Sequence, residues 1–169
     1  MKISIIIPVY NVEKYIHRCL TSIIKQTMTE EVECIIVNDA TPDKSIDIIQ
    51  ELLSDYRGNI SFHIINHKKN EGLAAARNSG MKHAKGDYVI HIDSDDFCET
   101  TMLEEMYNKA EEFHTDITMC DLKKVGVESE YTVSQPIREG YYNRSMIEII
   151  LFMFNKKYPR PKKKYSRQT

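Results

Sequence analysis

The sequence predicts an α/β fold, a three-layer α/β/α sandwich with a mostly parallel sheet. Short apolar runs rich in β-branched residues alternate along the chain with longer segments whose apolar residues recur at helical spacing. Strands that alternate with helices form parallel sheets with right-handed crossovers, so helices cover both faces. A length of 169 residues suits one domain with a substantial core.

The first strand and helix are expected within residues 2–24. KISIIIPVY, residues 2–10, is a β-branched apolar run that suits a strand buried on both faces. From Val12 to Ile24 the apolar residues recur at the i, i+3, i+4, i+7 spacing of an amphipathic helix. Asn11 is a favourable N-cap for that helix.

The second pair repeats this pattern. VECIIVND, residues 32–39, predicts another buried strand. Thr41 and Pro42 are the expected N-cap and first residue of a helix whose apolar stripe runs from Ile46 to Tyr56.

A third strand, a third helix and a fourth strand follow. ISFHIIN (60–66) and DYVIHID (87–93) are typical of strands. Between them, GLAAARNSGMKHA (72–84) predicts a helix of small residues that Gly86 ends.

The rest of the chain is less regular. An apolar stripe from Met102 to Phe113 predicts a helix, and DITMCD (116–121) predicts a fifth strand. Residues 123–135 have the pattern of a hairpin, and residues 145–155 that of a last apolar helix.

Composition and charge exclude several classes of protein. With 41% hydrophobic and 28% charged residues, the chain has the composition of a soluble protein. No apolar run reaches the roughly 18–20 residues needed to span a bilayer, and the start lacks signal-peptide features, so we expect a cytoplasmic location. The four cysteines are spread singly, which favours reduced thiols over a zinc site or disulfide framework.

The charge is uneven. The total is −2, but residues 156–169 hold seven Lys and Arg and no acid, which leaves residues 1–155 at −9. We therefore expect one domain over 1–155 and a basic, disordered tail over 156–169. Peripheral contact with an anionic membrane surface, at the inner face of the membrane, is the alternative role of the tail.

Polar residues gather where the predicted strands end. In open α/β sheets, ligands bind at the carboxyl ends of strands, where loops converge. Tyr10 and Asn11 close the first strand, Asp39 closes the second, residues 70–72 follow the third and residues 93–96 close the fourth. Four strand ends are thus expected to direct their polar groups at one crevice.

The fourth strand, in VIHIDSDDF (89–97), ends in three carboxylates. If the chain stays extended, Asp93 and Asp95 project to the same side with Cα atoms about 6.6 Å apart. Such carboxylates repel unless a cation lies beside them, and Mg²⁺ or Mn²⁺ completed by substrate phosphates would fill that role. The pattern therefore predicts a metal diphosphate as the ligand. We expect His91, on the same face, to be a packed strand histidine.

Other interpretations of the acidic stretch are weaker. A calcium loop starting at Asp93 would need Asp or Asn at its fifth position and Gly at its sixth, where Phe97 and Cys98 stand. The first strand is followed by no glycine fingerprint of a dinucleotide site, and the chain has no Walker phosphate loop. A simple helix cap remains as an alternative for DSDD.

Four motifs resemble a known family. PVYN after the first strand, IIVNDATPDKS at the second, NEGLAAARNSG after the third and HIDSDDF at the fourth resemble the inverting family 2 glycosyltransferases of the glycosyltransferase A fold, over about residues 3–120. Where the family usually has Gly and Ser after the second-strand Asp, this chain has Ala40 and Thr41.

The resemblance implies a nucleotide-diphospho-sugar donor, most often a UDP-sugar. It places Tyr10 against the base, with Pro8 and Asn11 shaping that pocket. Asp39 would accept a hydrogen bond from the base, which fits uracil because its ring N–H is a donor. Gly72 would provide a backbone shape that a side chain would block.

The resemblance also assigns the acidic DXD motif. Asp93 and Ser94 would face the ribose or sugar, and Asp95 would bind Mg²⁺ or Mn²⁺, with Asp96 as a support or loop cap. Arg77 is the expected cationic residue at the diphosphate or sugar, with a surface salt bridge as the alternative.

The catalytic base is not identified. Inverting transfer needs a base for the acceptor hydroxyl, and the family often uses a carboxylate of a Glu-Asp pair, which this chain lacks after Asp96. The end, FNKKYPRPKKKYSRQT, stands where related chains continue into their acceptor-binding half, so we expect a truncated or frameshifted chain.

Two functional hypotheses follow. The first is an active, metal-assisted transferase that acts with inversion on a glycan or lipid-linked acceptor in polysaccharide biosynthesis, without any nucleic acid partner. The second is an inactive nucleotide-sugar-binding remnant. A nucleotidyltransferase is less favoured, because it would carry a glycine-rich basic loop after its first strand.

Overall fold

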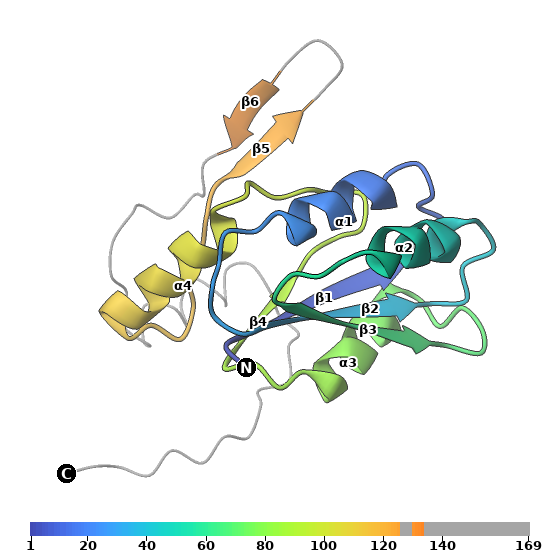
Figure 1. Ribbon diagram of the computed structural model, residues 1–169, viewed down its shortest axis with the longest axis horizontal. Coiled ribbons are helices and arrows are strands. Elements are labelled where there is room, and N and C mark those ends of the chain that lie inside the picture. The colour runs from blue at the N-terminus through green and yellow to red at the C-terminus, as the bar shows by residue number, and fades with distance from the viewer. Residues whose placement is uncertain (126–129, 134–169) are drawn as a thin grey trace, which may run out of the picture. The chain divides into compact units, whose positions relative to one another are not determined.

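The computed structural model describes residues 1–125 and 130–133, and the chain divides into two units, residues 1–119 and 120–169. In the first unit, strands and helices alternate along the chain (Figure 1). The elements are β1 (Ile3–Val9), α1 (Ile16–Ile24), β2 (Val32–Asn38), α2 (Ser45–Ser54), β3 (Ile60–Asn66), α3 (Leu73–His83), β4 (Tyr88–His91) and α4 (Met102–Phe113).

The four strands of this unit form a parallel sheet in the order β3-β2-β1-β4. Helices α1 and α2 lie on one face and α3 on the other (Figure 1), which confirms the predicted three-layer sandwich. The parallel order places the carboxyl ends of all four strands at the same edge of the sheet.

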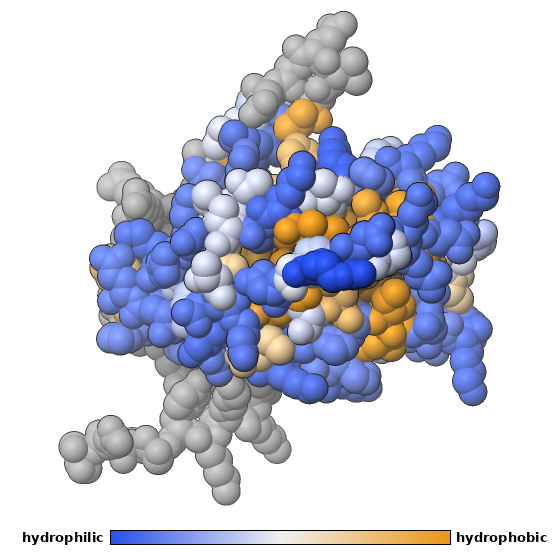
Figure 2. Space-filling view, in the orientation of Figure 1, coloured by the Kyte–Doolittle hydropathy of each residue, from blue (hydrophilic) through white to orange (hydrophobic). Residues whose placement is uncertain are grey.

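The central strands form the core. Every residue of β1 is buried, because the strand is covered by helices on both faces, as its unbroken apolar run predicts. Alternate residues of β1 pack against α1, whose buried side chains include Leu20 and Ile23. Ala76 of α3 packs on Ile35 and Val37 of β2. Full burial of one such side chain contributes roughly 1.5–3 kcal/mol. On the face drawn in Figure 2, hydrophilic residues predominate and hydrophobic ones show only among them.

Two helices begin later than predicted. Helix α1 begins at Ile16 because Asn11 adopts a left-handed conformation with φ of 56° and does not act as its N-cap. The backbone N–H of Asn11 donates instead to Oγ1 of Thr41 at 2.7 Å. Helix α2 begins at Ser45, and the carboxylate of Asp43, rather than Thr41, accepts the Ser45 N–H at 3.1 Å.

Ala40 occupies a backbone position that favours glycine. Its φ is 53°, in the left-handed region where a Cβ atom is disfavoured. The family that the sequence resembles usually has a glycine at this position, directly after the second-strand Asp.

Helix α3 ends at His83, before the predicted stop at Gly86. Gly86 serves close packing instead, since a Cβ atom there would fall 2.5 Å from the backbone nitrogen of Ser4.

The second unit contains an antiparallel hairpin of β5 (Leu122–Val125) and β6 (Glu130–Val133), which confirms the predicted hairpin. The strand predicted over 116–121 is wrong. Its alternating residues Ile117 and Met119 are about half exposed, so an extended strand there would bury little apolar surface.

Two other predictions lie outside the described residues, the helix over 145–155 and the basic tail over 156–169. The four cysteines, all in the described part of the chain, form no disulfide there. Among the helices in the described part of the chain, none combines the length and apolarity needed to cross a membrane.

Candidate functional site

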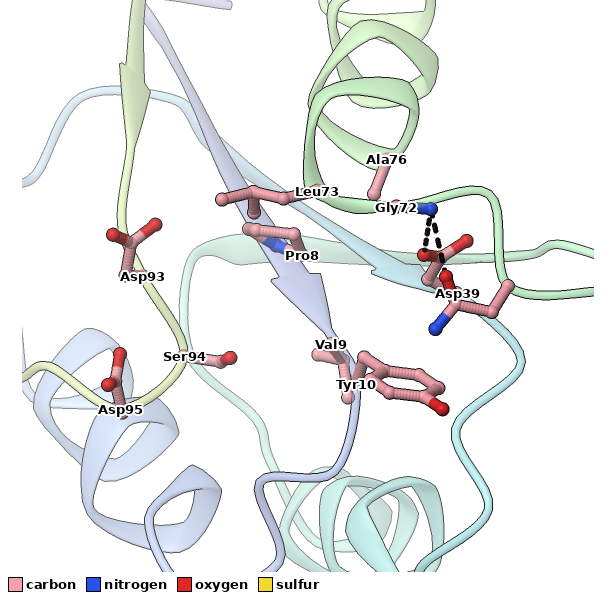
Figure 3. A pocket seen from close by; sticks show the side chains of 11 residues that line it. Pro8, Val9, Tyr10, Asp39, Gly72, Leu73, Ala76, Asp93, Ser94 and Asp95 are labelled. Carbon is pink, nitrogen blue, oxygen red and sulfur yellow. Dashed lines mark hydrogen bonds between the residues drawn. The ribbon is translucent and has the colours of Figure 1, made fainter.

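A cavity of about 400 Å³ lies at the carboxyl ends of the strands (Figure 3). The loops after β1, β2, β3 and β4 all contribute to it, as the spacing of polar residues predicts. Its lining consists of Pro8, Val9, Tyr10, Asp39, Asn70, Gly72, Leu73, Ala76, Asp93, Ser94 and Asp95.

The cavity has two chemically different sides. Asp39 and the 46% exposed ring of Tyr10 lie on one side of Pro8, and Asp93 and Asp95 lie on the other (Figure 3). One side thus offers an aromatic face and a single buried acceptor, and the other a pair of carboxylates.

Asp39 is 2% exposed and is held by three donors. Its Oδ1 accepts hydrogen bonds from Nδ1 of His67 at 2.7 Å and from the Glu71 N–H at 2.8 Å. Its Oδ2 accepts the Gly72 N–H at 2.8 Å. Burial alone would raise the pKa of Asp39, but these hydrogen bonds outweigh it and lower the pKa below its ordinary value, so the group is a carboxylate at neutral pH.

The loop before α3 depends on glycine. Gly72 has a φ of 88°, a conformation that side chains disfavour, which confirms the predicted role of this residue. Its N–H donates both to Asp39 and to Oδ1 of Asn70 at 2.9 Å (Figure 3). The chain therefore enters α3 directly over the Asp39 carboxylate.

His67 is a residue of this site that the sequence did not reveal. It lies in the polar stretch HKKN (67–70) after β3, which has the composition of an exposed loop, yet its side chain is only 9% exposed. Its Nε2 lies 2.9 Å from Oγ of Ser79 on α3, while its Nδ1 contacts Asp39.

Asn11 does not line the cavity. It is exposed, and its backbone supports the loop that begins at Thr41. Asn38, which ends β2, donates through Nδ2 to Oδ1 of Asn66 at 2.8 Å and so joins two neighbouring strand ends.

The acidic stretch turns rather than continuing as a strand. Strand β4 ends at His91, and the Asp96 N–H donates to the Asp93 carbonyl at 3.0 Å. The extended geometry predicted for Asp93 and Asp95 is therefore wrong, although both still line the cavity. His91 is exposed, in contrast to the packed histidine that we expected.

Arg77 of α3 pairs with the Asp93 carboxylate. The pair is partly exposed, with side-chain exposures of 33% for Arg77 and 47% for Asp93. The Arg77 Nε is buried and has no hydrogen-bond partner among the described residues. Arg77 is not among the residues that line the cavity, and its guanidinium contacts Asp93, which is.

Asp95 and Asp96 are held near a cation from α1. Arg18 donates to the backbone carbonyl of Asp95 at 3.3 Å, and its guanidinium lies 4.3 Å from the ring centroid of Phe97. Burial, together with the carboxylates of Asp95 and Asp93, raises the pKa of Asp96 above its ordinary value. Within residues 1–125 and 130–133, the Asp95 carboxylate makes no hydrogen bond or ion pair.

The acidic side of the cavity offers two carboxylates, those of Asp93 and Asp95, as ligands for a metal ion. Among the described residues, no three His, Cys, Asp or Glu side chains gather in an arrangement that could hold a metal ion. Mg²⁺ is commonly bound by one or two carboxylates together with substrate phosphates and water, so a pair is sufficient for that type of site.

Comparison with known proteins identifies the family. Residues 4–165 match glycosyl transferase family 2, and the chain therefore belongs to this family. The chain is 38% identical over 122 residues to the uncharacterized glycosyltransferase EpsJ of Bacillus subtilis, covering 72% of this chain and 34% of the relative. It is 41% identical over 127 residues to a poly(ribitol-phosphate) beta-glucosyltransferase of Bacillus spizizenii, covering 74% of this chain and 20% of that relative.

Solved structures agree with the fold. The S. aureus TarS fragment 1–349 in complex with UDP aligns with a TM-score of 0.63 at 33% identity, covering 69% of this chain and 34% of that one. The same fragment has also been solved with UDP-GlcNAc. The fold is therefore of the predicted glycosyltransferase A type. The chain spans about a third of EpsJ and of this TarS fragment, and a smaller part of the longer relative.

Proposed function

We propose that this chain binds the donor of a glycosyltransferase that moves a sugar from a UDP-sugar to an acceptor hydroxyl with inversion. The observation that supports it best is the buried Asp39 carboxylate, set beside the exposed Tyr10 ring in one cavity with Asp93 and Asp95. The UDP and UDP-GlcNAc complexes of TarS support the same donor class.

Recognition of the base follows from the chemistry of one side of the cavity. The ring of Tyr10 offers a face for stacking, and Pro8 lies beside it. A carboxylate only accepts hydrogen bonds, so Asp39 suits the ring N–H of uracil and disfavours the acceptor nitrogen in the same place on cytosine. Asn11 would act only through the loop backbone.

The diphosphate and sugar would lie toward the acidic side. Ser94 is 6% exposed and lines the cavity, which supports a contact of its hydroxyl with the ribose or sugar. Asp93, fixed by Arg77, would accept hydrogen bonds from sugar hydroxyls. The Arg77 guanidinium would also moderate the repulsion between Asp93 and the diphosphate.

A divalent cation, Mg²⁺ or Mn²⁺, fits the acidic side. The Asp95 carboxylate has no partner among the described residues, and carboxylate oxygens are the ligands that hard cations prefer. Asp95 would hold the ion, with Asp93 beside it. When bound, the ion would neutralise the leaving diphosphate.

The acceptor half of the reaction is assigned only by class. A glycan or lipid-linked hydroxyl in surface polysaccharide biosynthesis fits the family, and the name of one relative shows a polymeric acceptor with hydroxyl groups, poly(ribitol-phosphate). Peripheral membrane contact through residues 156–169 belongs to the same proposal.

Calorimetry of UDP with and without Mn²⁺, followed by a turnover assay on a panel of UDP-sugars, tests this function. We expect Mn²⁺ to tighten UDP binding by about tenfold or more, equivalent to roughly 1.4 kcal/mol. Turnover in the same samples would establish transfer, and binding without turnover would favour the donor-binding remnant. Absence of any UDP binding would refute the proposal.

The Asp95→Asn variant localises the metal. It should abolish the tightening by Mn²⁺ while leaving metal-free UDP binding and the melting temperature close to wild type. Asp55→Asn is the matched control, since Asp55 is exposed at the end of α2, away from the cavity. An undiminished Mn²⁺ effect in Asp95→Asn would place the ion elsewhere.

A further inference from the structure

We propose that His67 is a positioning residue that fixes the Asp39 carboxylate for recognition of the base and links it, through Ser79, to helix α3. This inference rests on the proposed function and adds to it a residue that determines specificity. His67 itself is not among the residues that line the cavity.

The geometry is a continuous row of three side chains. The His67 ring lies between Oδ1 of Asp39, 2.7 Å from Nδ1, and Oγ of Ser79, 2.9 Å from Nε2. The His67 and Asp39 side chains are 9% and 3% exposed, so water competes little for these contacts. Ser79 is partly buried in the middle of α3.

The hydrogen atoms in this row can be assigned from chemistry. An ionised Asp39 only accepts, so Nδ1 of His67 must carry a hydrogen and donate it. In a neutral ring, Nε2 then accepts the hydroxyl hydrogen of Ser79. The ring thus has a defined tautomer and orientation, and both of its nitrogen atoms have partners.

The row restricts what Asp39 can still bind. A carboxylate offers about four lone-pair positions. Three are taken by His67, Glu71 and Gly72, and the position that remains is on Oδ2. With His67 present, Asp39 therefore presents one acceptor to the cavity. Without it, Oδ1 would keep only the Glu71 N–H and Oδ2 only the Gly72 N–H, so the carboxylate would be held less firmly in the orientation that reads the base.

The row also connects the two sides of the site. Ser79 lies two residues after Arg77 on α3, and Arg77 holds Asp93 on the acidic side. One helix therefore anchors both the base-reading carboxylate, through His67, and the DXD motif, through Arg77.

A purely structural role for His67 makes a different prediction from a positioning role. If the residue only fills space, its loss should weaken all nucleotides alike or lower stability alone. If it orients Asp39, its loss should weaken ligands that offer a ring N–H and spare those that do not. UDP and CDP differ in this respect and share the ribose and diphosphate.

The experiment compares UDP and CDP affinity, in the presence of Mn²⁺, across four variants of the full chain. We expect His67→Ala to weaken UDP by about tenfold and CDP by less than about twofold, because a hydrogen bond to a charged group orients the reading acceptor. His67→Asn, whose amide nitrogen replaces Nδ1, should restore most of the UDP preference. His67→Gln, whose amide replaces Nε2, should not, and Ser79→Ala should lower the preference by about twofold to threefold.

Each outcome decides between roles. Equal weakening of UDP and CDP in His67→Ala, or an unchanged preference in that variant, would overturn the positioning role while leaving the proposed function intact. Better rescue by Gln than by Asn would also overturn it. If wild-type protein binds neither nucleotide, both proposals fail together. Because His67→Asn keeps the donor to Asp39, it provides a folded variant even where His67→Ala unfolds.

Discussion

At the scale of single residues, Asp43 holds two loops together. Its Oδ1 accepts from the hydroxyls of Ser45 and Thr41 at 2.6 and 2.7 Å, and its Oδ2 accepts the Glu13 N–H at 2.8 Å. Burial alone would raise the pKa of Asp43, but the hydrogen bonds from Ser45, Thr41 and Glu13 outweigh it and lower the pKa to about 2. This carboxylate therefore both caps α2 and anchors the loop after β1.

Asp43→Ala should lower the free energy of unfolding by about 1–2 kcal/mol at neutral pH, in the range of a lost N-cap. Because the folded pKa is lowered from 3.8 to about 2, the stabilisation is fully present above about pH 4 and is lost as the pH falls through 2. Urea unfolding of wild type and variant between pH 7 and pH 2.5 measures this difference.

The control for this prediction is Asp47→Ala, which removes an exposed acid from the first turn of the same helix. Its effect should be a few tenths of a kcal/mol. A gap between wild type and Asp43→Ala that stays constant down to pH 2.5 would contradict the assigned role of the carboxylate.

At the scale of elements, α3 is packed unusually close to the sheet at Gly80. This buried residue faces Ile6 of β1, and a Cβ atom added at position 80 would collide with Cγ2 of that isoleucine. The close approach matters for function because α3 carries both Arg77 and Ser79.

Gly80→Ala should therefore destabilise the protein by about 1–2 kcal/mol, although alanine is the better helix former by roughly 1 kcal/mol. Asn78→Ala, at an exposed position of the same helix, is the control and should be neutral or slightly stabilising. In the double variant Ile6→Ala, Gly80→Ala, the cost should be less than the sum of the single costs. Additive costs would show that the two residues do not collide.

The elements also show what the sequence could predict. The sequence predicts the positions of β1 and β2 closely because strands buried on both faces are mostly apolar runs. The partly exposed β3 is predictable because it is rich in β-branched and aromatic residues. The starts of α1 and α2 could not be predicted from the sequence, because Asn11 and Thr41 are joined by a hydrogen bond between two loops that are 30 residues apart. Such contacts leave no periodic signal.

The same distinction holds within the site. The strand-end positions of Tyr10, Asp39 and Asp95 followed from topology alone, since parallel strands end at one edge. His67 was missed because its burial comes from contacts with β2 and α3, which its polar neighbours in sequence do not reveal. The turn after Asp93 could not be predicted, because the spacing of the acidic residues does not show whether the backbone turns or stays extended.

At the scale of the whole molecule, a buried carboxylate anchors neighbouring chain segments at each end of the sheet. Asp39 holds the loop before α3 at the carboxyl ends. At the other end of β2, Glu33 is 1% exposed and accepts hydrogen bonds from Ser4 Oγ and the Lys85 N–H, both at 2.6 Å. The connections entering and leaving α3 are thus each fixed to β2 by a carboxylate.

Residues 1–119 should therefore form a donor-binding unit by themselves. All eleven residues that line the cavity lie between Pro8 and Asp95. Helices α1, α2 and α3 also lie within this unit. Helix α1 carries Arg18, and α3 carries Arg77 and Ser79, the partner of His67.

A fragment of residues 1–119 is expected to unfold cooperatively and to bind UDP with an affinity within about threefold of the full chain, because none of the cavity residues is removed. Circular dichroism on heating and calorimetry with UDP and Mn²⁺ measure the two properties separately. A folded fragment with affinity reduced tenfold would show that residues after 119 complete the site. A fragment that fails to fold would show that the first unit depends on the second for its stability.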